Sequence, residues 1–153
     1  MVLYRERLWA APWLYISTAL VIPASILVFA PISMIAGVIT ASVLYGGCVA
    51  MLIASSPVIR VTDSELFAGR ASITLTLVGE PTGYGPDAAV LERGQRLDAR
   101  AWLLIRGWVK PVVKVPVLDP QDPAPYWLIS TRSPDQLVRA LDEGRLAAAS
   151  AAS

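Results

Sequence analysis

The feature that most constrains this chain is a long segment without charge. Residues 8–59 contain no Asp, Glu, Lys or Arg, whereas charged side chains lie just before this segment and are spread through everything after it. Soluble globular domains and disordered chains distribute charge along their whole length. Together with a mean hydropathy of +0.55, this segregation excludes both classes. We therefore expect residues 8–59 to lie in a membrane and the remainder to face water.

The uncharged segment fits two spanning helices better than one. A spanning helix needs about 20 apolar residues, and Pro31 divides the segment because proline disfavours helical angles in the residue before it. We predict helices at about residues 11–30 and 33–55, within a membrane region of residues 10–56. Pro23 removes one amide donor inside the first helix and is expected to kink it.

Two other interpretations of the uncharged segment fit less well. A cleaved signal peptide would have a shorter apolar core, and a second span would not follow it directly. A buried helical hairpin of a soluble protein would carry a polar stripe on each helix, and no such stripe is present. The membrane interpretation is therefore preferred.

The basic residues predict the orientation of the spans. Arg5 and Arg7 precede the first span, Arg60 and Arg70 follow the second, and the connection between the spans is uncharged. Because Lys and Arg favour the cytoplasmic side, we expect both termini in the cytoplasm. Residues 1–9 then form a cytoplasmic segment at the membrane interface, where aromatic rings suit the headgroup layer. The predicted membrane-interface anchors are Arg5, Arg7, Trp9 and Trp13.

The predicted second span carries two lines of small residues at four-residue spacing. Such spacing lets two helix backbones approach closely in lipid. Packing against the first span is one interpretation, and a face for another membrane protein or a second copy is the other; two lines on one helix leave room for both. The predicted helix-packing face is Ser42, Gly46, Ala50 and Ala54, and the second line is Ser33, Gly37 and Ala41.

Residues 57–146 are predicted to form a small cytoplasmic β-rich domain with a C-terminal helix. Alternation of polar and apolar residues, bounded by Gly, Pro and Asp, is typical of half-buried strands. The predicted strands are 58–62, 65–68, 72–77, 101–106, 112–118 and 126–131. Pro116 favours an edge position for its strand, because proline cannot donate to a ladder. A short helix is predicted over residues 87–93.

The last helix is predicted to begin at Ser133, which can cap it, with Pro134 in the first turn. Leu137 and Leu141 lie on one face, so this amphipathic helix should pack on the sheet. Gly144 is expected to end or weaken the helix. Residues 147–153 contain only Ala and Ser and are predicted to form a disordered tail.

These elements predict an α+β membrane protein, in which a transmembrane helical hairpin precedes a small bent β-sheet or barrel closed by the amphipathic helix. The order of elements resembles the pleckstrin-homology-like domains that bacteria place after paired membrane helices. This likeness is architectural and by itself implies no function.

The residue inventory excludes several classes of site. Histidine is absent, so zinc sites and Ser-His-Asp or Cys-His nucleophiles are excluded. The lone Cys48 cannot form an internal disulfide. Residues 60–153 contain as many basic as acidic side chains, which excludes a nucleic-acid partner held by bulk charge. We predict no cofactor and no metal. The expected partners are the lipid bilayer and another membrane protein or a second copy.

A candidate interaction surface lies in the second half of the domain. Asp119 and Asp122 are flanked by prolines, which would hold paired carboxylates rigidly for acid–base chemistry or a hard cation; turn acceptors of backbone amides are the alternative. The tryptophans beside basic residues form either core or a basic–aromatic surface. The predicted surface residues are Asp119, Asp122, Tyr126, Trp127, Arg132, Trp108 and Lys110.

The chain also resembles an actinobacterial family of small membrane proteins of unknown function. The matching residues are 4–9, the two spans, residues 59–63 and the stretch Asp-Pro-Gln-Asp-Pro-Ala-Pro-Tyr-Trp-Leu-Ile-Ser-Thr-Arg at 119–132. This last stretch is the most specific part. The resemblance implies the two-span topology and supplies no reaction.

We therefore expect a membrane-anchored, non-catalytic cytoplasmic interaction module or an accessory subunit of a membrane protein assembly. The alternative is a membrane-bound enzyme that acts on a lipid or a cytoplasmic metabolite through Asp119 and Asp122. A transporter is disfavoured, because the spans contain no ionisable groups to line a path.

Overall fold

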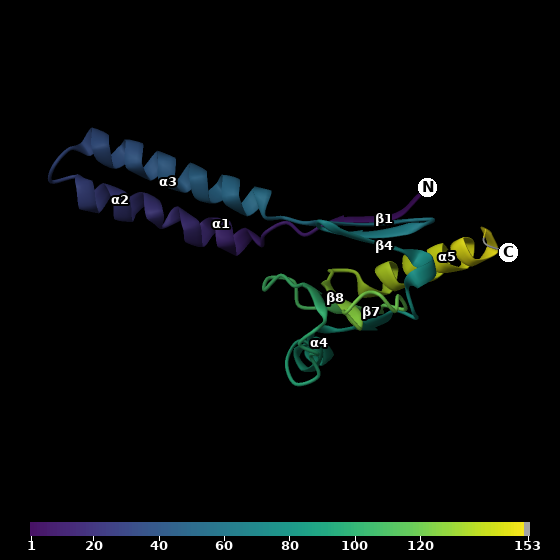
Figure 1. The fold of residues 1–153 in the computed structure, drawn as a ribbon. Coiled ribbons are helices and arrows are strands. Elements are labelled where there is room, and N and C mark those ends of the chain that lie inside the picture. The colour runs from purple at the N-terminus through teal and green to yellow at the C-terminus, as the bar shows by residue number, and fades with distance from the viewer. Residues whose placement is uncertain (152–153) are drawn as a thin grey trace. The chain divides into compact units, whose positions relative to one another are not determined.

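The computed structural model describes residues 1–151, which divide into two compact units (Figure 1). Trp9–Ser56 form the first unit, which we call the helical hairpin. Met1–Leu8 and the chain from Pro57 onward form the second, which we call the sheet domain. The chain therefore leaves the sheet domain after its first strand, passes through the hairpin and returns.

The helices of the hairpin are α1 (Pro12–Ala19), α2 (Val21–Phe29) and α3 (Met34–Ala54). The first helical segment is interrupted at Leu20, between α1 and α2, because Pro23 has no amide hydrogen with which to bond the carbonyl of Ala19. Pro12–Phe29 and Met34–Ala54 are long and apolar enough to cross a membrane, with mean hydropathies of 1.8 and 1.9. Their ends lie within one residue of the predicted ranges.

Small residues bring α2 and α3 together. Ser33 caps α3, since its side chain accepts the N–H of Ala36 at 3.3 Å. Gly37 and Ala41 are the buried residues of α3. A Cβ on Gly37 would lie 3.4 Å from the Cα of Ile26, so the two backbones approach closely there. The line of Ser33, Gly37 and Ala41 is thus the one that packs within the hairpin.

The first sheet contains β1 (Val2–Arg7), β2 (Val58–Thr62), β3 (Glu65–Ala68) and β4 (Ala71–Thr74), all antiparallel and in that spatial order. β2 and β3 have the predicted bounds. The predicted strand over residues 72–77 is shorter, because Leu75–Leu77 form a 3-10 helix, η1. Leu66 and Val61 are fully buried, so one face of this sheet faces the core.

The N-terminal segment contains a strand that the sequence analysis did not predict. Within residues 1–9, which are expected to form a cytoplasmic segment at the membrane interface, Val2–Arg7 form an outer strand of the first sheet, paired with β2. Leu8 is fully buried, and its N–H donates to the carbonyl of Pro57 at 2.9 Å. Local pattern did not indicate this strand, because its partner lies beyond the whole hairpin.

The second sheet has the order β5 (Thr82–Tyr84), β7 (Val112–Pro116), β8 (Tyr126–Ser130) and β6 (Trp102–Leu104). β6 and β8 run parallel, and the other pairs are antiparallel. The described strands therefore form two sheets in place of the predicted single bent sheet or barrel. β7 is an interior strand, and Pro116 is tolerated because β5 pairs only with residues 112–114.

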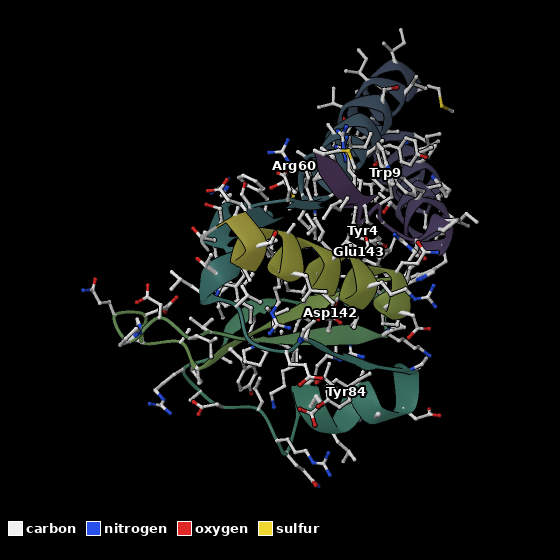
Figure 2. The ribbon with its side chains drawn as sticks, turned by 90° about the vertical axis from the view of Figure 1, so that its right-hand side faces the viewer. Tyr4, Trp9, Arg60, Tyr84, Asp142 and Glu143 are labelled. Atoms are coloured by element: carbon white, nitrogen blue, oxygen red, sulfur yellow. The ribbon has the colours of Figure 1, made fainter. Side chains whose placement is uncertain are left out.

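Helices cover both faces of the second sheet. On one face α4 (Pro86–Arg93) contributes Ala89 to a cluster with Tyr126 and Leu128. On the other, α5 (Pro134–Ala151) contributes fully buried leucines at 137 and 141 to the main core. Burying one such side chain stabilises the fold by about 1.5–3 kcal/mol. α5 contacts strands of both sheets and lies between them (Figure 2).

α5 also extends further than predicted. Gly144 does not end it, and residues 147–151 are helical rather than a disordered tail; residues 152–153 lie outside the described residues. Gly144 is buried, and a Cβ there would collide with the side chain of Leu75 and lie 3.0 Å from the carbonyl oxygen of Thr62. Glycine at this position therefore permits close packing of the helix.

Candidate functional site

Asp119 and Asp122 lie in the turn between β7 and β8. Oδ1 of Asp119 accepts the N–H of Gln121 at 2.9 Å, and Oδ1 of Asp122 accepts the N–H of Ala124 at 2.8 Å. Each carboxylate is therefore hydrogen-bonded within its own turn, a common role of aspartate at chain reversals. Within residues 1–151, no group of three or more His, Cys, Asp or Glu side chains is placed to hold a metal ion.

Tyr126 and Trp127 are core residues, which corrects their predicted place on an interaction surface. Their exposed fractions are 7 % and 4 %, and the ring of Trp127 lies against Trp102 with centroids 4.5 Å apart. β8 is buried along its whole length, because it is an interior strand with a helix over each face. The sequence pattern could not place these rings, since the strand register was unknown.

Glu92 of α4 is a buried carboxylate that no motif marked. Its exposed fraction is 2 %. Its carboxylate oxygens accept hydrogen bonds from the Arg96 guanidinium at 3.1 Å and from Nζ of Lys114 at 3.2 Å. Nζ of Lys114 also lies 4.2 Å from the ring centroid of Tyr126. The buried negative charge is thus compensated on both of its oxygens.

The surroundings of Glu92 shift its pKa. Burial by itself raises the pKa, and the hydrogen bonds and charges of Arg96 and Lys114 outweigh it, so the pKa of Glu92 lies below its ordinary value. The four-residue spacing of Glu92 and Arg96 was the available sequence signal. Lys114 comes from another strand, and only the fold brings it to the site.

A second polar cluster joins β1 to the segment after β8. The hydroxyls of Tyr4 and Thr131 donate to Oε2 of Glu6 at 2.8 and 2.6 Å, and the N–H of Arg132 donates to Oε1 at 3.0 Å. The Arg132 guanidinium, a predicted surface group, is 44 % exposed and lies 3.8 Å from Glu6. This cluster therefore fastens the N-terminal strand to the rest of the sheet domain.

Burial of the same cluster acts on Tyr4. The pKa of Tyr4 is raised to about 12. Desolvation is the largest cause, the hydrogen bond with Thr131 acts in the opposite direction, and the hydrogen bond and charge of Glu6 add to the rise. Tyr4 is thus held in its neutral form, as a donor to Glu6.

Lys110 and Trp108 lie in the loop between β6 and β7. Lys110 is exposed, its carbonyl accepts a hydrogen bond from the Arg93 guanidinium, and together with Arg93 it lines a cavity of about 460 Å³. Trp108 is half-buried against the main core, and its Nε1–H has no hydrogen-bond partner among the described residues. Lys110 therefore presents its charge to solvent, whereas Trp108 belongs to the margin of the core.

The predicted helix-packing face of α3 is exposed along its length. Its residues are Ser42, Gly46, Ala50 and Ala54. A Cβ on Gly46 would meet nothing within 4 Å, and the Ser42 hydroxyl donates to the carbonyl of Val38 within the helix at 2.8 Å. Ser42 and Gly46 also line an apolar groove of about 320 Å³ formed with α2. This face is distinct from the Gly37 and Ala41 face that packs on α2.

The predicted interface anchors lie where the strands pass into the helices. Arg5 and Arg7 are exposed on β1. Trp9 precedes α1 and Trp13 lies in its first turn, with exposed fractions of 46 % and 59 %. Two large aromatic rings near the start of a candidate span are typical of a membrane interface.

Residues 3–141 match the family described as Protein of unknown function (DUF3093). No curated protein and no solved structure matches the chain. The matched range begins in β1, includes the whole helical hairpin and ends within α5. Because this range covers most of both units, the chain belongs to the DUF3093 family of proteins of unknown function.

Proposed function

We propose that this protein is a membrane-anchored, non-catalytic interaction module, or an accessory subunit of a larger assembly, in a bacterial cell membrane. In this proposal residues 12–29 and 34–54 cross the bilayer, and the sheet domain with both termini lies in the cytoplasm. The apolar character of the two helices supports the spans, and the basic residues at their outer flanks support the orientation.

The observation that carries the proposal is the exposed small-residue face of α3. α3 uses one line of small residues, at Gly37 and Ala41, to pack on α2. The parallel line through Gly46 and Ala50 is exposed, and a Cβ on Gly46 would meet nothing within 4 Å. In lipid, where close van der Waals contact drives helix association, such a face suits the helix of another membrane protein or of a second copy.

In this proposal the sheet domain has no reaction to perform, and its role is to be held at the membrane where a partner can bind it. Its core is closed by α5, and the carboxylates of Glu92 and Glu6 are each held by hydrogen bonds, so it is suited to present a fixed surface to a partner. The alternative enzyme that uses Asp119 and Asp122 gains no support from the turn, because each of these carboxylates accepts a backbone amide.

The test compares two adjacent glycines of α3. A Cβ at Gly46 or at Gly47 would meet nothing within 4 Å, so Leu at either position should leave the hairpin folded. Gly46→Leu places bulk on the small-residue face, whereas Gly47→Leu is its matched control beside that face. The full chain, expressed at native level, is cross-linked in cells and purified in mild detergent.

We expect a cross-linked membrane protein or second copy with the natural chain and with Gly47→Leu, and its loss with Gly46→Leu. Recovery of monomer alone from all three chains contradicts the interaction module. The membrane location has its own test, since protease added outside spheroplasts should leave the C-terminal domain intact. Digestion of that domain, or solubility without detergent, contradicts the proposed topology.

A further inference from the structure

Two arginines lie directly opposite each other on the exposed face of the first sheet. Arg5 of β1 pairs with Arg60 of β2, and both side chains are exposed. Like charges at directly opposite positions of neighbouring strands destabilise a sheet. Arg60 lies on the side of the sheet away from α5 (Figure 2). The fold therefore places together two cations that repel each other.

No carboxylate of residues 1–151 lies within ion-pair distance of either guanidinium. Glu6, between Arg5 and Arg7 in sequence, is bonded to Tyr4 and Thr131 on the core side. Asp63, at the far end of the sheet, pairs with the N-terminal ammonium group at 2.7 Å. The charge of the arginine pair is thus uncompensated within the described chain.

The arginine pair also lines a small pocket. The guanidinium carbon of Arg60 lies 4.4 Å from the ring centroid of Phe67, which is opposite Arg60 on β3. Stacking on a ring orients the guanidinium plane while its N–H edges stay available. Arg5, Arg60, Phe67, Val58 and Gly69 line a pocket of about 260 Å³. Gly69 has a positive φ of 65°, so a residue without a side chain is favoured at this margin.

We propose that Arg5 and Arg60 form a binding site for the phosphate of an anionic lipid headgroup. Guanidinium groups bind phosphate through paired, charge-assisted hydrogen bonds, and an anion between the arginines removes their mutual repulsion. The lipid source is favoured over a soluble phosphate by connectivity, because β1 leads into α1 and β2 follows α3. An extended chain spans at most about 3.6 Å per residue, so the short connections 8–11 and 55–57 tether both arginines near the ends of the spans.

This inference rests on the proposed membrane location and adds a ligand to it. The test uses the full chain in neutral detergent micelles that contain equal amounts of phosphatidylglycerol and phosphatidylcholine, with bound lipid counted by native mass spectrometry. We expect the natural chain to retain phosphatidylglycerol in preference. The double variant Arg5→Gln/Arg60→Gln should bind it about tenfold more weakly, because two charge-assisted contacts are lost.

The matched control removes the same charge elsewhere. Lys110 and Arg139 are exposed, and neither side chain has an ion-pair partner among residues 1–151. Lys110→Gln/Arg139→Gln should therefore keep the preference. Equal weakening in both double variants would show a general effect of charge and overturn the site. Displacement of phosphatidylglycerol by equal concentrations of inorganic phosphate or glycerol phosphate would overturn the lipid assignment.

A charge exchange tests the same geometry without loss of the fold. Arg5→Glu places a carboxylate opposite Arg60, so an internal pair should occupy the pocket. We expect the lipid preference to disappear while the thermal unfolding temperature of the chain without lipid stays equal or rises. Retention of the preference in Arg5→Glu contradicts the site. A chain that remains in the membrane yet shows no phosphatidylglycerol preference contradicts this inference alone, and leaves the interaction module standing.

Discussion

Gly144 of α5 lies so close to Leu75 of η1 that a Cβ on the glycine would collide with the leucine side chain. The carbonyl oxygen of Thr62 closes the site from the first sheet, at 3.0 Å from the same Cβ position. The helix, η1 and β2 therefore meet at one position where only hydrogen fits. This contact decides how closely α5 approaches the first sheet.

We predict that Gly144→Ala destabilises the chain, although alanine favours an isolated helix over glycine by about 1 kcal/mol. The added methyl group forces α5 away from Leu75, and overpacking of this kind costs about 1–3 kcal/mol. Denaturant unfolding of the full chain in detergent measures the change. Glu143→Ala, at the exposed neighbouring position, is the control and should have little effect. A more stable Gly144→Ala chain would show that the helix is free to move.

We predict that Glu6→Gln loosens β1. The carboxylate accepts three hydrogen bonds, from Tyr4, Thr131 and the N–H of Arg132. In glutamine an NH₂ group replaces one of the two acceptor oxygens, so at least one of these donors loses its partner. Leaving a partly buried group unsatisfied costs about 1–3 kcal/mol. Hydrogen exchange of the β1 amides should accelerate. Glu65→Gln on β3 serves as the comparison, and equal acceleration in both would argue against a role of the cluster.

Alkaline pH should weaken the fold through Tyr4. Burial raises the pKa of Tyr4 to about 12 from its ordinary value of 10.0, so the folded state favours the neutral phenol. The resulting stability is fully present below pH 10 and is lost as pH rises toward 12. Tyr4→Phe cannot ionise and should show a smaller decline over this interval. The measurement is the stability of both chains at a fixed denaturant concentration as pH rises. If stability falls equally in both chains, groups other than Tyr4 cause the alkaline loss.

Acid should weaken the fold through Glu92. Because the pKa of Glu92 is lowered in the folded state, its stability is present above the ordinary glutamate pKa and is lost as pH falls through the folded value. Glu92→Gln should destabilise the chain at neutral pH by about 1–3 kcal/mol, since Lys114 loses its anionic partner. It should also flatten the acid dependence of unfolding. Glu80→Gln, at an exposed site, should leave both properties unchanged.

Local sequence patterns predicted the elements whose formation depends on neighbours in sequence. The hairpin helices end within one residue of their predicted bounds, and β2 and β3 have the predicted bounds. Apolar runs, a dividing proline and strand alternation are local signals, and the local backbone follows them. The prediction of a disordered tail after Gly144 was wrong, because it considered local sequence only. Gly144 packs closely on Leu75, and this tertiary contact favours a continuous helix there.

The candidate sites depended on pairings that local patterns do not contain. Tyr126 and Trp127 were candidates for an interaction surface, and the position of β8 inside a sheet buries them. Glu92 became a paired buried carboxylate only through Lys114, 22 residues away in sequence. Side-chain identity alone does not distinguish a buried ring from an exposed one until the register is known.

By itself, the sequence determined that a charge-free helical hairpin is separate from a charged sheet domain. The reason is that the free energy of moving a segment from water to an apolar environment depends on which apolar and charged residues it contains. Only the tertiary structure decided that β1 pairs with β2 across the whole hairpin and so sets Arg5 against Arg60. The physical reason is that strand pairing depends on the total contact energy between residues far apart in the chain, which the sequence of one segment does not specify.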